Sequence, residues 1–300
     1  MEQHEINQIV AELPKGRTLF PYFKDQYALR LLSTFVGEST DVRTIKRSRF
    51  AGLLDKPILK NFLAQHGHDT ITQDDLACIW PCEPEYYRLS LGIWGDSGYW
   101  GQYWQQTSRP GKNLVLQLNF PNKHNVVYQR EIFQRQKQHP FRWSSHPVHR
   151  GDEYTLAWAR LDIDPVHGIA LIEEIQTDWI RSAKVRSRTQ PDVRRYIEQA
   201  LQTHLGMWDE AMLSATLWFL RRELGITQVY YHTVESGLRL KGFGPDESQP
   251  PRSLYSKLPR RFCFTKTPNL PDFLLRHRRV RREVRKGELR MYRLGLGRAS

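Results

Sequence analysis

The succession of strand patterns around one long helical pattern restricts the fold of this chain more than any other feature. Residues 113–120 (NLVLQLNF) and 154–163 (YTLAWARLDI) are rich in branched and aromatic side chains, as strands are. Residues 168–175 (GIALIEEI) begin as a continuous apolar run and end in carboxylates. The clearest helical pattern, residues 208–224, leads directly into a strand at 228–232. This succession predicts an α+β fold.

The parts of the chain on either side of these patterns have different sequence patterns. Helical patterns dominate the N-terminal third, and we expect residues 1–84 to form a small helical region, with Thr72 capping one of its helices. After residue 250 the sequence predicts a short helix at 254–258 and a strand at 262–264. Residues 273–300 are rich in arginine and are expected to be a tail, which leaves residues 85–272 as the main domain.

The excess of basic residues points to an anionic partner. The 300 residues include 45 Lys and Arg against 32 Asp and Glu, a formal net charge of +13. A surface with this excess of positive charge usually binds a partner that carries phosphate groups. Since 39% of the residues are hydrophobic, the chain is globular rather than disordered.

Several classes of protein are not expected from this sequence. No run approaches the ~20 apolar residues of a membrane-spanning helix, so we expect no membrane partner. The polar first residues (MEQHE) do not resemble a secretory signal, and three cysteines are too few for a disulfide framework. These observations favour the cytoplasm.

The order of the patterns from residue 113 onward resembles that of the GNAT acyltransferase fold, most closely over residues 225–264. The resemblance implies a GNAT-like α/β domain with a mostly antiparallel central sheet, and acetyl-CoA or another acyl-CoA as cofactor. It implies that Tyr255, in LYSKLPRRF, is the general acid toward the departing thiolate. The glycine-rich turn that holds pyrophosphate in that family corresponds here to residues 202–208 (QTHLGMW), which contain one glycine. Basic side chains of residues 181–195 are therefore expected to bind the phosphates.

A second resemblance concerns residues 173–179 (EEIQTDW). This segment is similar to the E-I-Q-x-D-W signature in domains of large phage polyvalent proteins, and the whole sequence is similar to a family of bacterial proteins. Neither resemblance implies an activity.

The same segment is the expected reaction site. Strand alternation puts Glu174, Gln176 and Asp178 on one face and Glu173 on the other. Three polar groups on one face of an inner strand need partners or a cavity. Either Glu174 or Asp178 acts as a base and Gln176 orients the substrate, or the segment holds a carboxylate that is paired with one of the many arginines. The expected catalytic residues are Glu174, Asp178 and Tyr255; the expected substrate-binding residues are Gln176, Trp179, His232, Arg181, Arg186 and Arg188.

Other clusters have weaker functional interpretations. The aromatic stretch 86–104 either stacks on unpaired bases, with Trp100 as its test residue, or fills a core and a turn. His66, His68, Cys78 and Cys82 offer four soft ligands, but their spacing does not match a zinc site, and no metal is expected.

Two functions from different classes remain open. The first is an acyltransferase-like enzyme acting on a nucleic-acid-linked or otherwise anionic substrate. The alternative is a non-catalytic protein that binds RNA or single-stranded DNA on a repurposed GNAT-like fold, through arginines such as those of residues 276–286. The sequence does not predict an oligomeric state.

Overall fold

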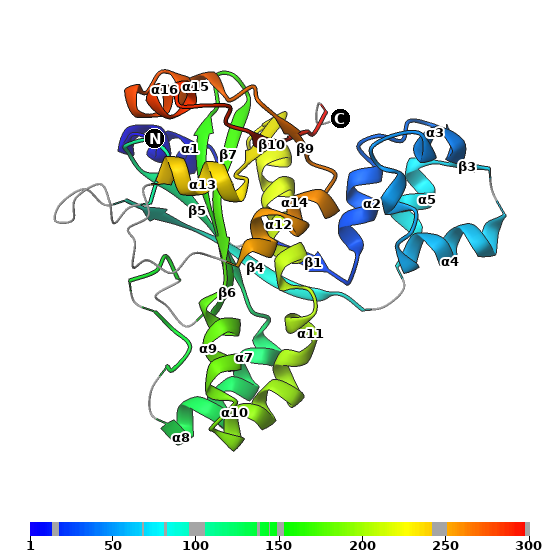
Figure 1. Ribbon diagram of the computed structural model, residues 1–300. Helices are drawn as coiled ribbons and strands as arrows, with labels where there is room; N and C mark the ends of the chain where they lie inside the picture. Colours follow the sequence, from blue (N-terminus) through cyan, green and yellow to red (C-terminus); the bar gives the residue numbers. More distant parts are fainter. Residues whose placement is uncertain are drawn as a thin grey trace.

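The protein is built around one large mixed sheet. The computed structural model (Figure 1) describes residues 1–13, 18–67, 69–80, 83–95, 106–136, 139–143, 145–148, 153–241 and 251–297. Within them, eight strands form a sheet in the order β1-β4-β5-β6-β7-β8-β10-β9. Together with the helices on both sides, this sheet confirms the α+β class. The strands are β1 (Thr18–Tyr22), β4 (Glu85–Trp94), β5 (Asn113–Asn119), β6 (Thr155–Asp164), β7 (Ile169–Gln176), β8 (Gln228–Tyr231), β9 (Thr265–Thr267) and β10 (Met291–Gly295).

Neighbouring strands of the sheet are antiparallel with one exception. β7 and β8 are parallel, because α12 (Trp208–Arg222) connects them as a crossover helix. The stripe that predicted α12 is buried: Met212, Leu213 and Leu220 pack against apolar side chains of β5, β6 and β7. α12 therefore fixes the position of β8 beside β7, where the candidate site lies.

A second hydrophobic cluster lies beside β7, β8 and β10. Leu171 and Tyr230 of the sheet pack there with Leu240 of α13 (Val234–Lys241), Phe273 of α15 (Asp272–Leu275) and Val280 of α16 (Arg278–Arg285). The end of α13 is thereby held against the sheet, which places Lys241 at the candidate site.

A group of short helices packs at one end of the sheet, at the bottom of Figure 1. Its core is aromatic, with Tyr128, Trp179 and Tyr196 all buried and the indole Nε1 of Trp179 donating to the Tyr196 hydroxyl at 2.9 Å. Trp179, which we expected to bind substrate, is therefore a core residue. The elements are α7 (Asn122–Tyr128), the π-helical η2 (Gln129–Phe133), α8 (Gln134–Gln136), α9 (Asp178–Arg186), α10 (Pro191–Tyr196), the π-helical η3 (Ile197–Leu201) and α11 (Gln202–Leu205).

The N-terminal region contains helices, as expected, and three strands that were not expected. The predicted cap is confirmed, since the Thr72 hydroxyl accepts from the backbone N–H of Asp75 at 3.0 Å. Residues 18–22 form β1 and pair with β4, so the helix that follows begins only at Gln26. Pro21 fits this position because β1 is at the edge of the sheet. The remaining elements are α1 (Gln3–Glu12), α2 (Gln26–Leu32), β2 (Thr40–Asp41), α3 (Val42–Lys46), the 3-10 turn η1 (Ala51–Leu53), α4 (Pro57–His66), β3 (Thr70–Ile71) and α5 (Gln73–Cys78).

The C-terminal part differs most from the sequence-based expectation. The expected short helix is present as the 3-10 turn η4 (Arg252–Tyr255) followed by α14 (Lys257–Arg261). The strand predicted at 262–264 is wrong, because Cys263 has φ +60° and extended pairing starts at Thr265. The expected tail is also wrong for residues 278–295, since α16 packs on the sheet and β10 lies between β8 and β9.

Candidate active site

Two parallel strands separate at a group of buried ionisable side chains. β7 and β8 are paired from Ile169 and Gln228 as far as Ile172 and Tyr231. Beyond this point β7 continues to Gln176, whereas β8 ends and the chain turns at His232 into α13. We call this place, where the two strands part, the fork.

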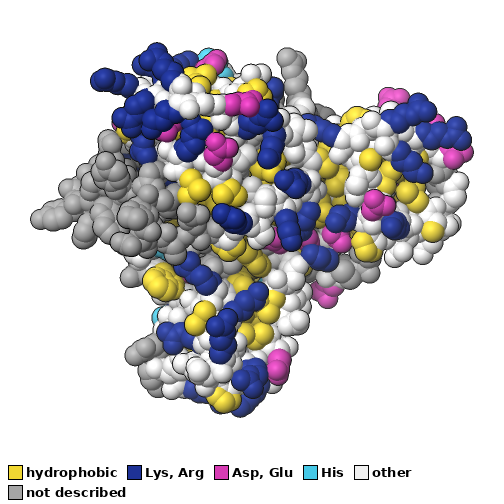
Figure 2. Space-filling model, viewed as in Figure 1, with side chains coloured by type: hydrophobic (Ala, Val, Ile, Leu, Met, Phe, Trp, Pro, Cys, Tyr) yellow, Lys and Arg dark blue, Asp and Glu magenta, His cyan; other side chains and the backbone are white. Residues whose placement is uncertain are grey.

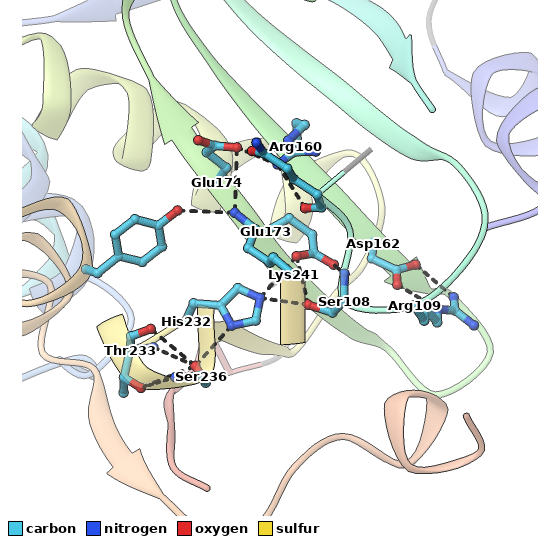
Figure 3. A network of polar contacts seen from close by, with 12 residues as sticks. Ser108, Arg109, Arg160, Asp162, Glu173, Glu174, His232, Thr233, Ser236 and Lys241 are labelled. Carbon is cyan, nitrogen blue, oxygen red and sulfur yellow. Dashed lines mark hydrogen bonds and ion pairs between the residues drawn. The ribbon is translucent and has the colours of Figure 1, made fainter. Parts of the chain in front are cut away.

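A β-bulge determines which side chains meet at the fork. Across β6 and β7, Leu161 is opposite Ile172 and Arg160 is opposite Glu174, so Glu173 is the extra residue. The predicted alternation put Glu173 and Glu174 on opposite faces, which is wrong because the bulge interrupts it. Both carboxylates join one buried polar network (Figure 3).

Glu173 joins the β7 side of the fork to the β8 side. Its Oε2 lies 3.0 Å from Nε2 of His232, and its two oxygens accept from the backbone N–H and the hydroxyl of Ser108, both at 2.9 Å. The other ring nitrogen of His232, Nδ1, lies 3.0 Å from the hydroxyl of Ser236 in α13. Glu173, His232 and Ser236 are fully buried, so these bonds close the fork with side chains instead of a backbone ladder.

The residue types of this group match a catalytic triad, but Ser108 does not have the connections of a triad serine. In a triad the serine and the carboxylate contact different nitrogens of the histidine. Here the Ser108 hydroxyl and the Glu173 carboxylate both contact Nε2 of His232, and Ser108 donates to Glu173. This arrangement orients the imidazole and does not activate Ser108 as a nucleophile. Ser236 does contact the ring nitrogen opposite to Glu173, but it is fully buried and its hydroxyl also accepts from the backbone N–H of Thr233 at 2.9 Å.

Glu174 holds the second half of the network. Its Oε2 forms an ion pair with the Arg160 guanidinium and lies 3.6 Å from the Lys241 ammonium. Lys241 Nζ in turn lies 3.2 Å from the hydroxyl of Tyr255. The predicted catalytic residues Glu174 and Tyr255 are thus brought together, with Lys241 between them.

Burial and charge set the protonation of these groups. Burial raises the pKa of Glu173, but the hydrogen bond and charge of His232 outweigh it and leave the pKa at about 2. Burial also raises the pKa of Glu174, and the Lys241 and Arg160 charges more than reverse this. Both groups are therefore carboxylates, and Glu174 is a weak base.

The pKa values of the neighbouring groups are shifted in the directions that favour their neutral forms. Burial lowers the pKa of His232 and of Lys241, although Glu173 and Glu174 respectively oppose the effect. Burial and the Glu174 charge raise the pKa of Tyr255 well above its usual value. The network therefore contains a firmly protonated hydroxyl beside an amine whose proton is held less tightly than usual.

Asp178 and Gln176 belong to a neighbouring set of contacts. Asp178 is the first residue of α9 and is bound by Nδ1 of His146 at 2.7 Å and by the Arg181 guanidinium at 2.8 Å. The Gln176 amide also donates to it, at 3.3 Å. These bonds give Asp178 the role of anchoring α9 and the His146 loop. Lys184, Arg186 and Arg188 follow on α9 and just beyond its end.

Five members of the network were not among the predicted site residues: Ser108, Arg160, Glu173, Ser236 and Lys241. Glu173 was placed on the face opposite to the expected site, and Arg160 had a visible signal, since it is one of two charged residues in a mainly apolar strand pattern. Ser108 lies in a polar loop and Lys241 near the end of α13, and nothing in the local sequence distinguishes them from exposed residues. Their positions depend on tertiary contacts.

Other predicted features give no site in the described part of the chain. It contains no group of three or more His, Cys, Asp or Glu arranged to hold a metal. Among those residues, no helix has the length and apolar character needed to cross a membrane. Trp100, His68 and Cys82, and the side chain of His66, lie outside the described residues.

A comparison with protein-family models gave no match, and neither did comparisons with curated proteins and with solved structures. The geometry of the fork and the charge of the surface are therefore the basis on which we infer a function.

Proposed function

We propose that the chain is an acyltransferase-like enzyme of the GNAT type that acts on an anionic substrate, with the fork as its reaction centre. The observation that carries the proposal is the separation of β7 from β8 at the Glu174–Lys241–Tyr255 contacts. Burying several charged groups in one sheet is costly, and such groups gather more often at reaction sites than elsewhere.

The arrangement of the elements supports a GNAT-like reading of the fold. β5, β6, β7, α12, β8 and α14 follow one another in the order on which the sequence resemblance rests. Because β8 pairs with β7 only as far as Ile172, an extended amide-containing donor such as an acyl-pantetheine has a strand edge to pair with, in the manner of an added strand.

The proposed reaction uses the protonated Tyr255 and the buried Lys241. The acceptor attacks the acyl carbonyl, the bond from the carbonyl carbon to the leaving group breaks, and the leaving group takes the proton of the Tyr255 hydroxyl. Lys241, at 3.2 Å, returns a proton to Tyr255 and in its neutral form takes the proton of the acceptor. Glu174 supplies a fixed counter-charge, which replaces the role of base that we expected for it.

The first turn of α12 does not fit the pyrophosphate of coenzyme A. Lys24 Nζ is bound to the Gly206 carbonyl at 2.7 Å and to the Glu210 carboxylate at 2.8 Å. Glu210 also accepts from Arg261, whose other nitrogen binds Asp209 at 3.1 Å. The basic groups at this helix end are thus neutralised by the chain's own carboxylates. The proposed donor is therefore an acyl thioester, and this helix end is not its phosphate site.

Tyr255→Phe is the direct test of this proposal. The phenyl ring retains the packing against Tyr231, and only the transferable proton is removed. We expect thiol release from acetyl-CoA or a short acyl thioester, measured with a thiol reagent in the presence of nucleotide and RNA acceptors, to fall about 10²- to 10⁴-fold. Tyr230→Phe, which changes a tyrosine of β8 outside these contacts, should retain the rate.

Calorimetry separates the choice of donor from the reaction itself. Heat with acetyl-CoA that weakens on Arg186→Ala or Arg188→Ala would assign its phosphates to α9, as the sequence predicts. Absence of heat at millimolar acetyl-CoA and at millimolar short thioester, together with absence of thiol release, would refute acyl transfer.

A second candidate function, binding of nucleic acid without catalysis, is favoured by the surface of α16. Arg278, Arg281, Arg282 and Arg285 are all exposed and are spaced to lie on one face of the helix. The acid in this helix, Glu283, is buried and bound to Lys286 at 2.6 Å. Basic side chains gather over this helix at the top of Figure 2. Such a face binds the phosphate backbone of nucleic acid with no need for base contacts.

The salt dependence of binding tests the α16 face. Replacing Arg278, Arg282 and Arg285 by glutamine should lower the slope of log affinity against log salt by up to about 2.7 on duplex DNA, because each phosphate contact contributes ~0.9. The matched control is Arg43, Lys46 and Arg47→Gln, which removes the same charge from exposed positions in and next to α3. Equal slopes for the two triple variants would show that only net charge matters.

A further inference from the structure

An exposed indole is held next to a row of basic side chains on α9. Trp143 is 49% exposed, although it is one of the largest apolar side chains in the chain. Its Nε1 donates to the hydroxyl of Ser182 at 3.1 Å, and the Arg181 guanidinium carbon lies 5.7 Å from the ring centroid. We call Trp143 with His146 and Arg181 the Trp143 platform.

The orientation of the platform is fixed by contacts with the buried carboxylate of Asp178. The His146 ring is stacked on Trp143, with centroids 6.0 Å apart and planes at 26°. His146 and Arg181 each contact one oxygen of the buried Asp178 carboxylate: Nδ1 of His146 lies 2.7 Å from Oδ2, and the Arg181 guanidinium donates to Oδ1 at 2.8 Å. An exposed ring held in this way loses little conformational entropy when a ligand stacks on it.

The basic side chains next to the platform lie on one face. Lys184 and Arg188 follow Arg181 by three and seven residues, which places all three on the same side of α9 and its C-terminal end. All three are exposed, and within the described residues neither Lys184 nor Arg188 has an acidic partner. The face therefore combines a fixed aromatic ring with two uncommitted cations.

We propose that the Trp143 platform binds single-stranded nucleic acid, with an unpaired base stacked on Trp143 and the adjoining phosphates bound by Lys184 and Arg188. Aromatic rings interleaved with cations are the arrangement by which proteins bind unpaired strands, because every base has a π face and every nucleotide a phosphate. In a duplex the base faces are stacked on one another, so a duplex can bind only to the cations of this site. The site shares Arg188 with the residues expected to bind acetyl-CoA phosphates, but its base-stacking residue, Trp143, has no part in acyl transfer at the fork. It differs from the α16 face in distinguishing single strands from duplexes.

The test compares strand preference in two tryptophan variants. Fluorescence anisotropy is measured with labelled oligo(dT), oligo(U) and a duplex of the same length at one salt concentration. Trp143→Ala should weaken single-strand binding roughly 5- to 150-fold and change duplex binding less than about twofold, whereas Trp143→Phe should retain most of the affinity. Trp80→Ala removes an indole of similar exposure from the N-terminal region and should change neither.

A charge variant tests the same surface without touching the core of the platform. Lys184→Gln with Arg188→Gln should lower the single-strand salt slope by about 1.4, from ~0.7 per contact. Melting curves check that each variant is folded. The proposal is overturned if Trp143→Ala and Trp80→Ala bind single strands alike, or if Trp143→Ala weakens duplex and single-strand binding equally. Binding that responds only to the α16 triple variant would also overturn it, and would identify a backbone-reading surface alone.

Discussion

Arg160→Met is expected to lower the free energy of unfolding by about 3–5 kcal/mol, because it leaves the Glu174 carboxylate buried without its closest counter-charge. Both side chains are nearly inaccessible, at 1% and 3% exposure, and Lys241 at 3.6 Å is a more distant partner. Methionine fills much of the arginine volume, so the loss measures the charge more than a cavity. Urea unfolding followed by circular dichroism gives the free energy directly.

A double-mutant cycle shows whether the effect belongs to the pair. Adding Glu174→Gln removes the uncompensated charge, so the double variant should be more stable than Arg160→Met alone, and the two changes should not be additive. Arg130→Met is the control: Arg130 pairs with Glu131 at 2.7 Å but is largely exposed, and its loss should change stability by no more than about 1 kcal/mol. Similar effects for Arg160 and Arg130 would mean that the Glu174 pair is accessible to water and that the fork is not a low-dielectric site.

The sequence predicted the location of this site better than its connections. The carboxylates at the end of residues 168–175 could be recognised, because polar groups at the end of an apolar strand need partners, whereas Tyr255 was expected only from the resemblance to the GNAT fold. The partner of each carboxylate could not be predicted, since it depends on the bulge at Glu173. A bulge arises from the register between β6 and β7, and that register is a property of the pair of strands and not of either segment.

The fold was predictable where one pattern is long and strongly periodic. α12 and the strands β5 and β6 are close to the predicted ranges, because each buries a continuous apolar surface. β1 and β10 were missed for a physical reason. β1 contains a proline, and β10 follows an arginine-rich helix, so neither segment has the composition of a strand. In such segments the long-range strand partner determines the structure.

Removing residues 276–300 is expected to abolish cooperative folding, although the arginines in this segment suggest a dispensable tail. The deletion removes β10, and with it the neighbour that joins β9 to β8. It also removes six buried apolar side chains: Val280, Leu289, Met291, Tyr292, Leu294 and Leu296. At about 1.5–3 kcal/mol for each, this loss is as large as the whole stability of a typical domain, about 5–15 kcal/mol. The truncated chain should aggregate or show no melting transition.

The triple variant of Arg278, Arg282 and Arg285 separates the contribution of this segment to folding from its contribution to nucleic-acid binding. It removes basic charge from the exposed face of α16 and leaves the buried Val280 and the whole of β10 in place, so its melting transition should remain cooperative. Loss of nucleic-acid binding in the truncated chain would therefore not show that the arginines bind nucleic acid, because the fold is lost as well. Loss of binding in the triple variant would show it. A truncated chain that melted cooperatively near the temperature of the full chain would contradict the placement of β10 between β8 and β9. The segment would then be a tail after all, and its arginines alone would account for any effect of the deletion on binding.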